Sequence, residues 1–365
     1  MSLTRRTLIA ASVAGLAAGK AARSDTPPRE SLTFVCVPGT WHGGWVWTPL
    51  AEALHRRGHR CFRVTCTGVG ERAHLISPEV GLDTHARDVT QVIRYEALER
   101  VVLVGHSFAG VTITEVADRL AGSGRVAALL YYDAFIPTPA RPAWVMRDDA
   151  GQWPEWWRDR QSRFVDGYKM DFASEYPIRM LVDPEATPEL ARSVAERLTY
   201  HPARQWSEPA SFANGGWQAY PRAYVHCTGQ AYRQSSSAMF GPAKEPGWQF
   251  ETSDTVRLGM LTAPDDTAAL FERIGHSLCV TLLQVAVHLG ERRLLRPHHN
   301  GDAGGNRERD TDQQHDLAHG RDLQHGSQLN LRDTNRLDVG GGYGGFHECG
   351  FLLSRQLAPV TRACS

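Results

Sequence analysis

The sequence predicts an α/β fold in which a mostly parallel β-sheet is covered by helices on both faces. Three observations support this prediction. Short apolar runs alternate with segments of helical periodicity, the apolar runs lack polar alternation, and glycine or proline closes several of the segments. Continuous apolar strands are typical of parallel sheets that are buried on both faces.

The predicted elements follow one another in a regular order. The apolar runs expected to form strands cover residues 32–37, 59–66, 101–105, 126–135 and 223–228. Between them, residues 48–57, 84–95 and 108–120 carry apolar side chains at helical spacing and are expected to form helices. Turn residues end two of these segments, since Pro38-Gly39 follows the first strand and Gly58 follows the first helix.

One domain of this kind is expected over residues 32–275, because a chain of 365 residues with 42% hydrophobic positions can bury a full core. Residues 137–222 interrupt the alternation with a segment rich in tryptophan, proline and charge, including the run WPEWW at 153–157. An insertion between two buried strands commonly folds over the carboxyl edge of the sheet as a cap. Its aromatic residues favour a lining that faces an apolar space, and a plain surface excursion is the alternative.

The two ends of the chain differ from this domain. Residues 1–24 place Arg5-Arg6 before an apolar run over residues 8–18, which is the layout of a twin-arginine export signal. The run is too short to span a bilayer core of roughly 30 Å, so we expect an exported, periplasmic or secreted protein without a membrane span. Residues 276–365 contain few aliphatic residues and no sustained period, which predicts a disordered tail. A metal-binding tract built from its histidines is the alternative.

Charge and cysteine content restrict the partners. Forty basic and forty acidic side chains cancel, so no long-range field attracts the protein to nucleic acid or to an anionic membrane. The seven cysteines have no metal-ligand spacing. A small molecule is therefore the expected ligand, and the composition does not indicate an oligomeric state.

A candidate nucleophile lies in the run VVLVGHSFAGV at 101–111. Ser107 stands between a predicted buried strand and a predicted helix, where a tight turn flanked by small residues holds a serine nucleophile in place. The motif departs from G-x-S-x-G because Ala109 takes the last position. The backbone N–H of Phe108 is the expected first donor of an oxyanion hole, and the N–H of Thr40 in the loop after the first strand is the second.

Together, the segments FVCVPGTWHGGWVW, TGVGERAHL, GLDTHARDV, VVLVGHSFAG and LLYYDAFIP resemble the α/β-hydrolase superfamily. Within it they are similar to the small esterases related to plant salicylate-binding methyl esterases and hydroxynitrile lyases. The resemblance covers about residues 32–274 and implies an α/β-hydrolase fold of about eight strands with a cap, ester hydrolysis, and no metal or cofactor.

The acid and the base depart from the pattern of these relatives. No carboxylate lies near Thr228-Gly229-Gln230, where the resemblance implies the acid, so Asp133 at the end of a predicted strand is the candidate, with a structural capping role as the alternative. The resemblance implies a general base at about Arg257, and an arginine has no acceptor atom. The alternative bases are His42, His106 and His226.

These residues predict a serine esterase that acts on carboxylic esters of small apolar molecules through an acyl-enzyme at Ser107. The missing histidine makes efficient turnover doubtful, because removing one triad member costs several orders of magnitude in rate. Two alternatives remain: a catalytically impaired hydrolase that binds a ligand under its cap, and a hydroxynitrile-lyase type of enzyme, which needs the same histidine.

Overall fold

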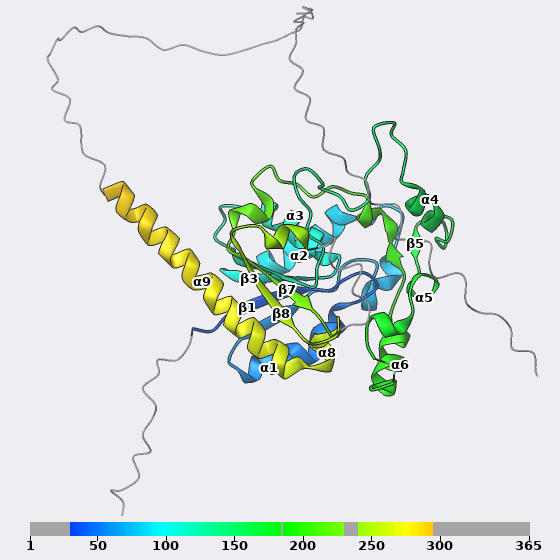
Figure 1. Ribbon diagram of the computed structural model, residues 1–365, viewed down its shortest axis with the longest axis horizontal. Helices are drawn as coiled ribbons and strands as arrows, with labels where there is room; N and C mark the ends of the chain where they lie inside the picture. Colours follow the sequence, from blue (N-terminus) through cyan, green and yellow to red (C-terminus); the bar gives the residue numbers. More distant parts are fainter. Residues whose placement is uncertain (1–29, 184, 230–239, 295–365) are drawn as a thin grey trace, which may run out of the picture. The chain divides into compact units, whose positions relative to one another are not determined.

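The computed structural model describes residues 30–183, 185–229 and 240–294 of the chain (Figure 1). The predicted export signal over residues 1–24 and the predicted tail beyond residue 294 lie outside the described residues. The chain divides into two compact units, residues 1–289 and 290–365, and the described residues 290–294 of the second unit are helical. Within the described ranges, no helix is both long enough and apolar enough to cross a membrane.

The central element is a six-stranded sheet in which every neighbouring pair is parallel. Its strand order is β2-β1-β3-β4-β7-β8. The strands are β1 (Thr33–Val37), β2 (Arg60–Arg63), β3 (Val101–His106), β4 (Val126–Tyr132), β7 (Arg222–Cys227) and β8 (Trp248–Ser253). The predicted parallel sheet is therefore confirmed. The other two strands of the described chain, β5 (Lys169–Met170) and β6 (His201–Pro202), pair with each other in the cap, which leaves the main sheet two strands short of eight.

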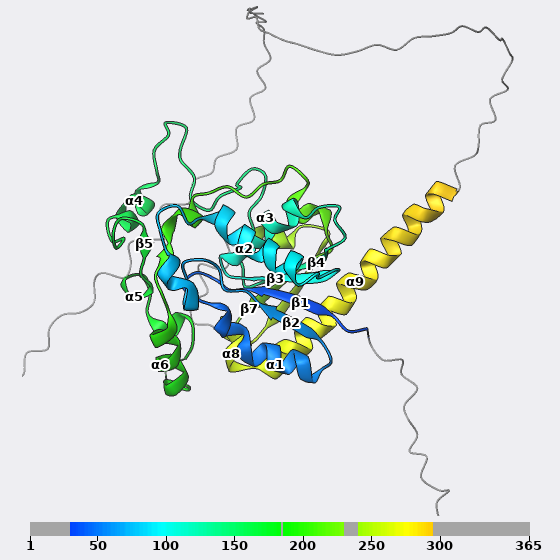
Figure 2. The same cartoon turned by 180° about the vertical axis from the view of Figure 1, so that it is seen from behind.

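Helices cover both faces of this sheet (Figures 1 and 2). Alternate side chains of β1 enter two separate cores, Phe34 on one face and Val35 on the other. Helices α1 (Thr48–Arg56) and α9 (Pro264–Leu294) contribute apolar side chains to the first core, and the short α8 (Gly259–Thr262) adds Met260. Helices α2 (Leu82–Tyr95) and α3 (Ala109–Arg119) contribute to the second core.

Three of the differences from the predicted boundaries have a clear local cause. Strand β4 ends at Tyr132 instead of residue 135, because Asp133 adopts a left-handed backbone with φ of 43°. Strand β8 was not among the predicted apolar runs, since this half-buried strand alternates apolar and polar residues. Helix α9 continues beyond residue 275, and Leu278 is buried in the core.

The insertion over residues 137–222 contains α4 (Glu155–Gln161), α5 (Phe172–Glu175), α6 (Pro188–Arg197) and the β5-β6 pair. Short 3₁₀ segments complete the described chain: η1 (Gly44–Trp47), η2 (Gly70–Leu75), η3 (Ile178–Met180), η4 (Ala203–Trp206), η5 (Gly216–Ala219) and η6 (Gly241–Lys244). The cap has a charged core of its own, because the Arg160 guanidinium lies 3.1 Å from the Glu175 carboxylate and both side chains are 6% exposed. The same guanidinium lies 4.3 Å from the ring centre of Trp206.

Candidate active site

Ser107 occupies a sharp turn between β3 and α3. Its backbone φ of 55° lies in the left-handed region, which a residue with a side chain seldom adopts without a compensating role. The backbone N–H of Ser107 donates to Tyr132 O, and the Ser107 carbonyl accepts from Phe135 N–H at 2.9 Å. These bonds tie the turn to the end of the neighbouring strand β4, so the strained conformation is held on both sides.

The glycines of this turn explain why Ala109 can replace the last glycine of the motif. A Cβ placed on Gly110 would lie 2.1 Å from the carbonyl oxygen of Phe135, so no side chain fits there. On the other side, a Cβ on Gly39 would lie 2.7 Å from Ser107 Cβ. The close contact that excludes a side chain therefore falls at Gly110, one residue after the last position of the motif. Ala109 can keep its methyl group, which packs in the core.

The loop after β1 brings Thr40 to the same cavity as Ser107. The peptide that follows Thr40 is fixed on both sides, since its carbonyl accepts from His42 Nδ1 at 2.7 Å and the Trp41 N–H donates to His201 Nδ1 at 3.3 Å. Trp41 itself has a φ of 71°. Within the described ranges, neither the Thr40 N–H nor the Phe108 N–H donates to another protein group. Both remain available to an incoming oxygen atom.

Asp133 follows β4 directly and its side chain is completely buried. Its Oδ1 accepts from the Cys227 N–H at 3.4 Å and lies 3.5 Å from His226 Nδ1. Its Oδ2 lies 2.5 Å from Nη1 of Arg257. A buried carboxylate requires such compensation, and here a guanidinium and a backbone amide supply it.

Arg257 bridges the candidate acid and the candidate nucleophile. It lies between β8 and α8, and its side chain is 11% exposed. Nη1 donates to Asp133, and Nη2 donates to Ser107 Oγ, each at 2.5 Å. The side chain at the predicted position of the general base therefore contacts both residues. In a serine triad an imidazole makes these two contacts, but it accepts the serine proton, whereas a guanidinium only donates.

The three alternative histidines do not take the position of the general base. Burial, followed by the charge of Arg257, lowers the pKa of His106 well below its usual value. Burial also lowers the pKa of His42 to about 4 against the opposing bond to the Thr40 carbonyl. His226 faces Asp133. In the described part of the chain, none of these imidazoles forms a hydrogen bond with Ser107 Oγ.

A small cavity of about 80 Å³ opens beside Ser107. Thr40, Ser107 and Arg257 line its polar side, and the cap closes it with Phe172, Tyr176 and Trp206. The arrangement combines a few convergent polar groups with an apolar wall, as small-molecule sites do. Three aromatic residues of the insertion therefore line this cavity.

Two residues that position this site were not found from the sequence. Trp206 stacks on Phe108 with ring centres 4.7 Å apart, and Trp157 stacks on Trp206 at 6.0 Å. His201 accepts from the Trp41 N–H and contacts Gln205. Both Trp206 and His201 come from the insertion, where spacing along the chain carries no periodic signal. Within WPEWW, Trp157 builds the cap core while Trp156 is exposed.

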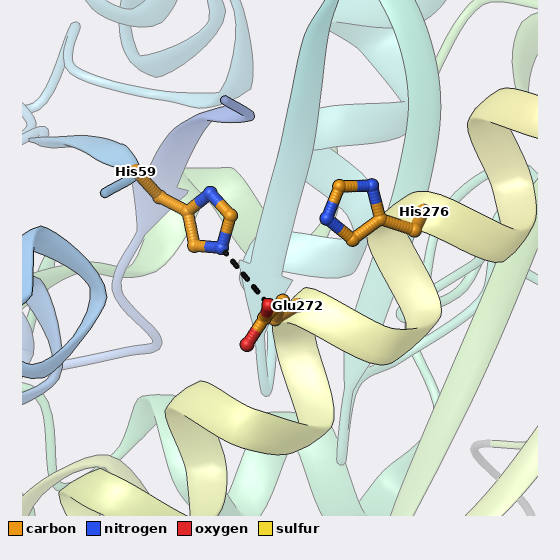
Figure 3. A group of neighbouring side chains, drawn as sticks. All are labelled: His59, Glu272 and His276. Atoms are coloured by element: carbon orange, nitrogen blue, oxygen red, sulfur yellow. Dashed lines mark ion pairs between the residues drawn. The ribbon is translucent and has the colours of Figure 1, made fainter. Parts of the chain in front are cut away.

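A second group of side chains could supply metal ligands. His59, Glu272 and His276 place three ligand atoms within 4.8 Å of one another. The side chains of Glu272 and His276, both on α9, face His59 (Figure 3). His59 Nε2 lies 3.8 Å from Glu272 Oε1, while Arg57 Nε donates to the other carboxylate oxygen at 2.7 Å.

The hydrogen bond to His59 opposes a metal at this group. The Leu32 N–H donates to His59 Nδ1 at 3.2 Å, so the neutral ring carries its proton on Nε2. That proton points toward Glu272, where a metal would need a lone pair. The cluster is therefore suited to joining α9 to the residues just before β2, through the ion pair of Arg57 with Glu272.

Comparison with known proteins gives a consistent result. The family described as "Alpha/beta hydrolase family" matches residues 34–281. A carbendazim hydrolyzing esterase from Nocardioides sp. is 33% identical over 252 residues, which is 66% of this chain and 99% of that protein. Methylesterase 2 from Arabidopsis thaliana is 24% identical over 203 residues, 53% of this chain and 76% of that protein.

Among solved structures, an extracellular alpha/beta-hydrolase from a Paenibacillus species has a similar fold. The superposition has a TM-score of 0.52 at 20% identity, and it covers 67% of this chain and 99% of that chain. At this identity the likeness concerns the fold alone.

Proposed function

Since the chain belongs to the alpha/beta hydrolase family, and its relatives include esterases, we propose that it is a serine hydrolase acting on carboxylic esters of small apolar molecules. The observation that carries the proposal is Ser107, held in a strained turn at the start of α3 with its side chain at the edge of a capped cavity. The reaction passes through an acyl-enzyme at Ser107 Oγ.

In this reaction Ser107 Oγ attacks the ester carbonyl, and the carbonyl oxygen becomes an oxyanion. The N–H groups of Thr40 and Phe108 are the proposed donors to that oxyanion, and the start of α3 adds a favourable dipole. The alcohol leaves with a proton, and water then releases the acid. Asp133 fixes Arg257 by their ion pair.

Removal of the proton from the Ser107 hydroxyl is the difficult step. Arg257 stabilises a developing alkoxide by its charge, but it cannot take the proton. Water or hydroxide must therefore accept it, and a positioned general base that contributes about 10²- to 10⁴-fold in rate is missing. We expect slow turnover, limited by formation of the alkoxide.

The position of Arg257 also favours a second function, that of a catalytically impaired hydrolase which binds a ligand beneath its cap. Removal of a triad member leaves the oxyanion hole and the binding pocket in place. The two functions differ in one observable, because only the hydrolase forms a covalent bond at Ser107.

A fluorophosphonate probe tests the proposal. We expect slow, stoichiometric labelling of the full-length protein, with the modified peptide containing Ser107. Ser107→Ala abolishes the labelling, whereas Ser123→Ala, which changes an exposed turn serine, leaves it unchanged. Labelling that persists in the Ser107→Ala protein overturns the assignment of the nucleophile. A fully unlabelled wild-type protein favours the ligand-binding function.

We further propose that residues 1–24 direct export through a twin-arginine pathway, on the strength of Arg5-Arg6 and the apolar run after them. Changing both arginines to lysine is expected to retain the protein in the cytoplasm of a bacterium that has this pathway. Unchanged export of that variant, measured by fractionation, would exclude a twin-arginine signal.

A further inference from the structure

Two cysteine side chains meet on neighbouring strands at one edge of the sheet. The Sγ atoms of Cys36 on β1 and Cys61 on β2 lie 3.6 Å apart, and both thiols are free. The two strands are parallel neighbours, with Phe34 opposite Cys61 (Figure 2). Because alternate side chains of a strand share a face, Cys36 points to the same side of the sheet as Phe34 and Cys61. The register therefore brings the two thiols together diagonally across the strand pair.

The core contacts of the cysteines agree with this pairing. Cys36 is completely buried in the first core, and the half-buried Cys61 packs against the same core. Cys66 is the competing partner, because it follows Cys61 closely in the sequence. It is buried in the second core, on the other face of the sheet. Cys36 is therefore the thiol that Cys61 faces.

The edge position of β2 allows the small movement that a bond between these sulfur atoms requires. A disulfide bond is about 2.05 Å long, so the two Sγ atoms must approach by about 1.5 Å. Among the described strands β2 pairs only with β1, and none of its four residues is fully buried. A strand that is closely packed on one side only can shift toward its neighbour with less disruption than a central strand.

We propose that Cys36 and Cys61 form a modification site, at which an external disulfide of the glutathione class oxidises the two thiols to a disulfide that joins β1 to β2. The inference goes beyond the proposed function, because neither cysteine lines the cavity beside Ser107. The export proposed for residues 1–24 would carry this site into an oxidising environment, where disulfides persist.

The oxidation takes place in two exchange steps. Cys61 is the thiol that solvent reaches, so its thiolate attacks one sulfur of oxidised glutathione, forms a mixed disulfide and releases one glutathione thiolate. Cys36 then gives up its proton and attacks the Cys61 sulfur, which releases the second glutathione thiolate. Two electrons pass to glutathione, and its two thiols carry away the two protons. Burial, followed by the neighbouring sulfur, raises the pKa of Cys36, so the second step is the slower one.

The bond is expected to stabilise the domain. The two cysteines are 25 positions apart, and the segment between them contains α1 and the loop that carries Thr40. A cross-link over such a segment restricts the unfolded chain, which has more freedom to lose than the folded one. We expect the melting temperature of the oxidised protein to exceed that of the reduced protein by at least about 4 °C.

Peptide mapping of the full-length protein tests the site. The protein is incubated with excess oxidised glutathione near pH 8, its remaining thiols are blocked with N-ethylmaleimide in denaturant, and it is digested with trypsin without reduction. Trypsin cleaves after arginine, so Cys36, Cys61 and Cys66 fall in three separate peptides, residues 30–56, 61–63 and 64–72. We expect the first two peptides to appear as one linked species that reduction separates.

Three results of this mapping overturn the proposal. They are blocked but unlinked thiols at both Cys36 and Cys61, glutathione that remains attached to Cys61, and a link from Cys61 to Cys66. The last result would mean that β2 turns its thiol toward the other face of the sheet.

Variants separate the bond from general effects of oxidation. Cys61→Ser replaces a half-buried thiol and is expected to abolish both the linked species and the rise in melting temperature. Cys279→Ser, which changes another half-buried cysteine on α9, is the matched control and is expected to retain both. A rise that persists in Cys61→Ser, or an oxidised wild type no more stable than the reduced one, overturns the stabilising role of the bond. Fluorophosphonate labelling, which reports on Ser107, is independent of these measurements.

Discussion

Replacing Arg257 with histidine tests whether the segment between β8 and α8 still has the geometry of a general base. Arg257 contacts both Asp133 and Ser107 from one side chain, at 2.5 Å each. An imidazole at this position can donate from Nδ1 to the carboxylate and accept the serine proton at Nε2. The substitution therefore adds the acceptor that arginine lacks and keeps a donor for the buried acid.

The expected gain is smaller than that of an evolved base. A positioned general base contributes about 10²- to 10⁴-fold in rate. Histidine is shorter than arginine, so the ring reaches both partners only if the backbone moves inward, and misplacement by about 1 Å can cost 10²-fold. We therefore expect kcat/KM to rise by at least about tenfold.

The assay is hydrolysis of p-nitrophenyl acetate near pH 7 by the wild type and by Arg257→His. Arg257→Lys serves as the control, because it keeps the cation beside Asp133 and still provides no acceptor while protonated. Adding Asp133→Asn to Arg257→His is expected to remove the gain, since the carboxylate sets the tautomer of the ring. A folded Arg257→His protein that is no faster than Arg257→Lys refutes the reasoning and means that the segment no longer presents a base.

Four further predictions follow from the missing base, the pKa of His42, the buried ion pair and the tail. Without an imidazole base, log(kcat/KM) of the wild type is expected to rise with pH from 7 to 9, and a plateau with an inflection between pH 6 and 8 would instead identify a histidine base. His42 has its pKa lowered from 6.5 to about 4, so the unfolded state binds more protons and this residue makes stability rise with pH across this window by about 3 kcal/mol. His42→Asn is expected to reduce the pH dependence of stability in urea unfolding, while the lowered pKa of His106 keeps part of it, and an unchanged pH dependence would contradict the prediction. Arg257→Gln is expected to cost about 3–5 kcal/mol of folding stability, because buried Asp133 loses its cation, and adding Asp133→Asn is expected to restore most of it. An unchanged stability of Arg257→Gln in urea unfolding would show that the pair contributes nothing. Deleting residues 295–365 is expected to leave the melting temperature within a few degrees, and a large decrease would show that they support the domain.

Much of the fold could be predicted because the apolar pattern is strong where the structure is most buried. Strands β1, β3, β4 and β7 are buried over nearly their whole length, and their runs of apolar residues are visible in the sequence. The edge strand β8 carries no such run, because it is partly exposed. The continuation of α9 was missed for a different reason: its apolar residues lie close to a segment whose composition predicts disorder.

The site was predictable only in part. Ser107, Thr40 and Phe108 could be proposed because their motifs adjoin buried strands, so the local sequence determines where they lie. Trp206 and His201 were missed, because they act on the site through the cap and come from a segment of irregular structure. No local pattern reports a contact between residues about a hundred positions apart.

The pairing of Asp133 with Arg257 explains why neither residue could be assigned from its own position. A carboxylate that is fully buried after β4 requires a cation, and the 2.5 Å contact with Arg257 supplies one. A histidine would meet this requirement only in part, since a neutral imidazole donates a hydrogen bond without a charge. The arginine therefore satisfies the acid better than a base would, at the expense of proton transfer from Ser107. Stability of the buried pair and catalysis by the triad make opposite demands on residue 257, and the structure meets the first of them.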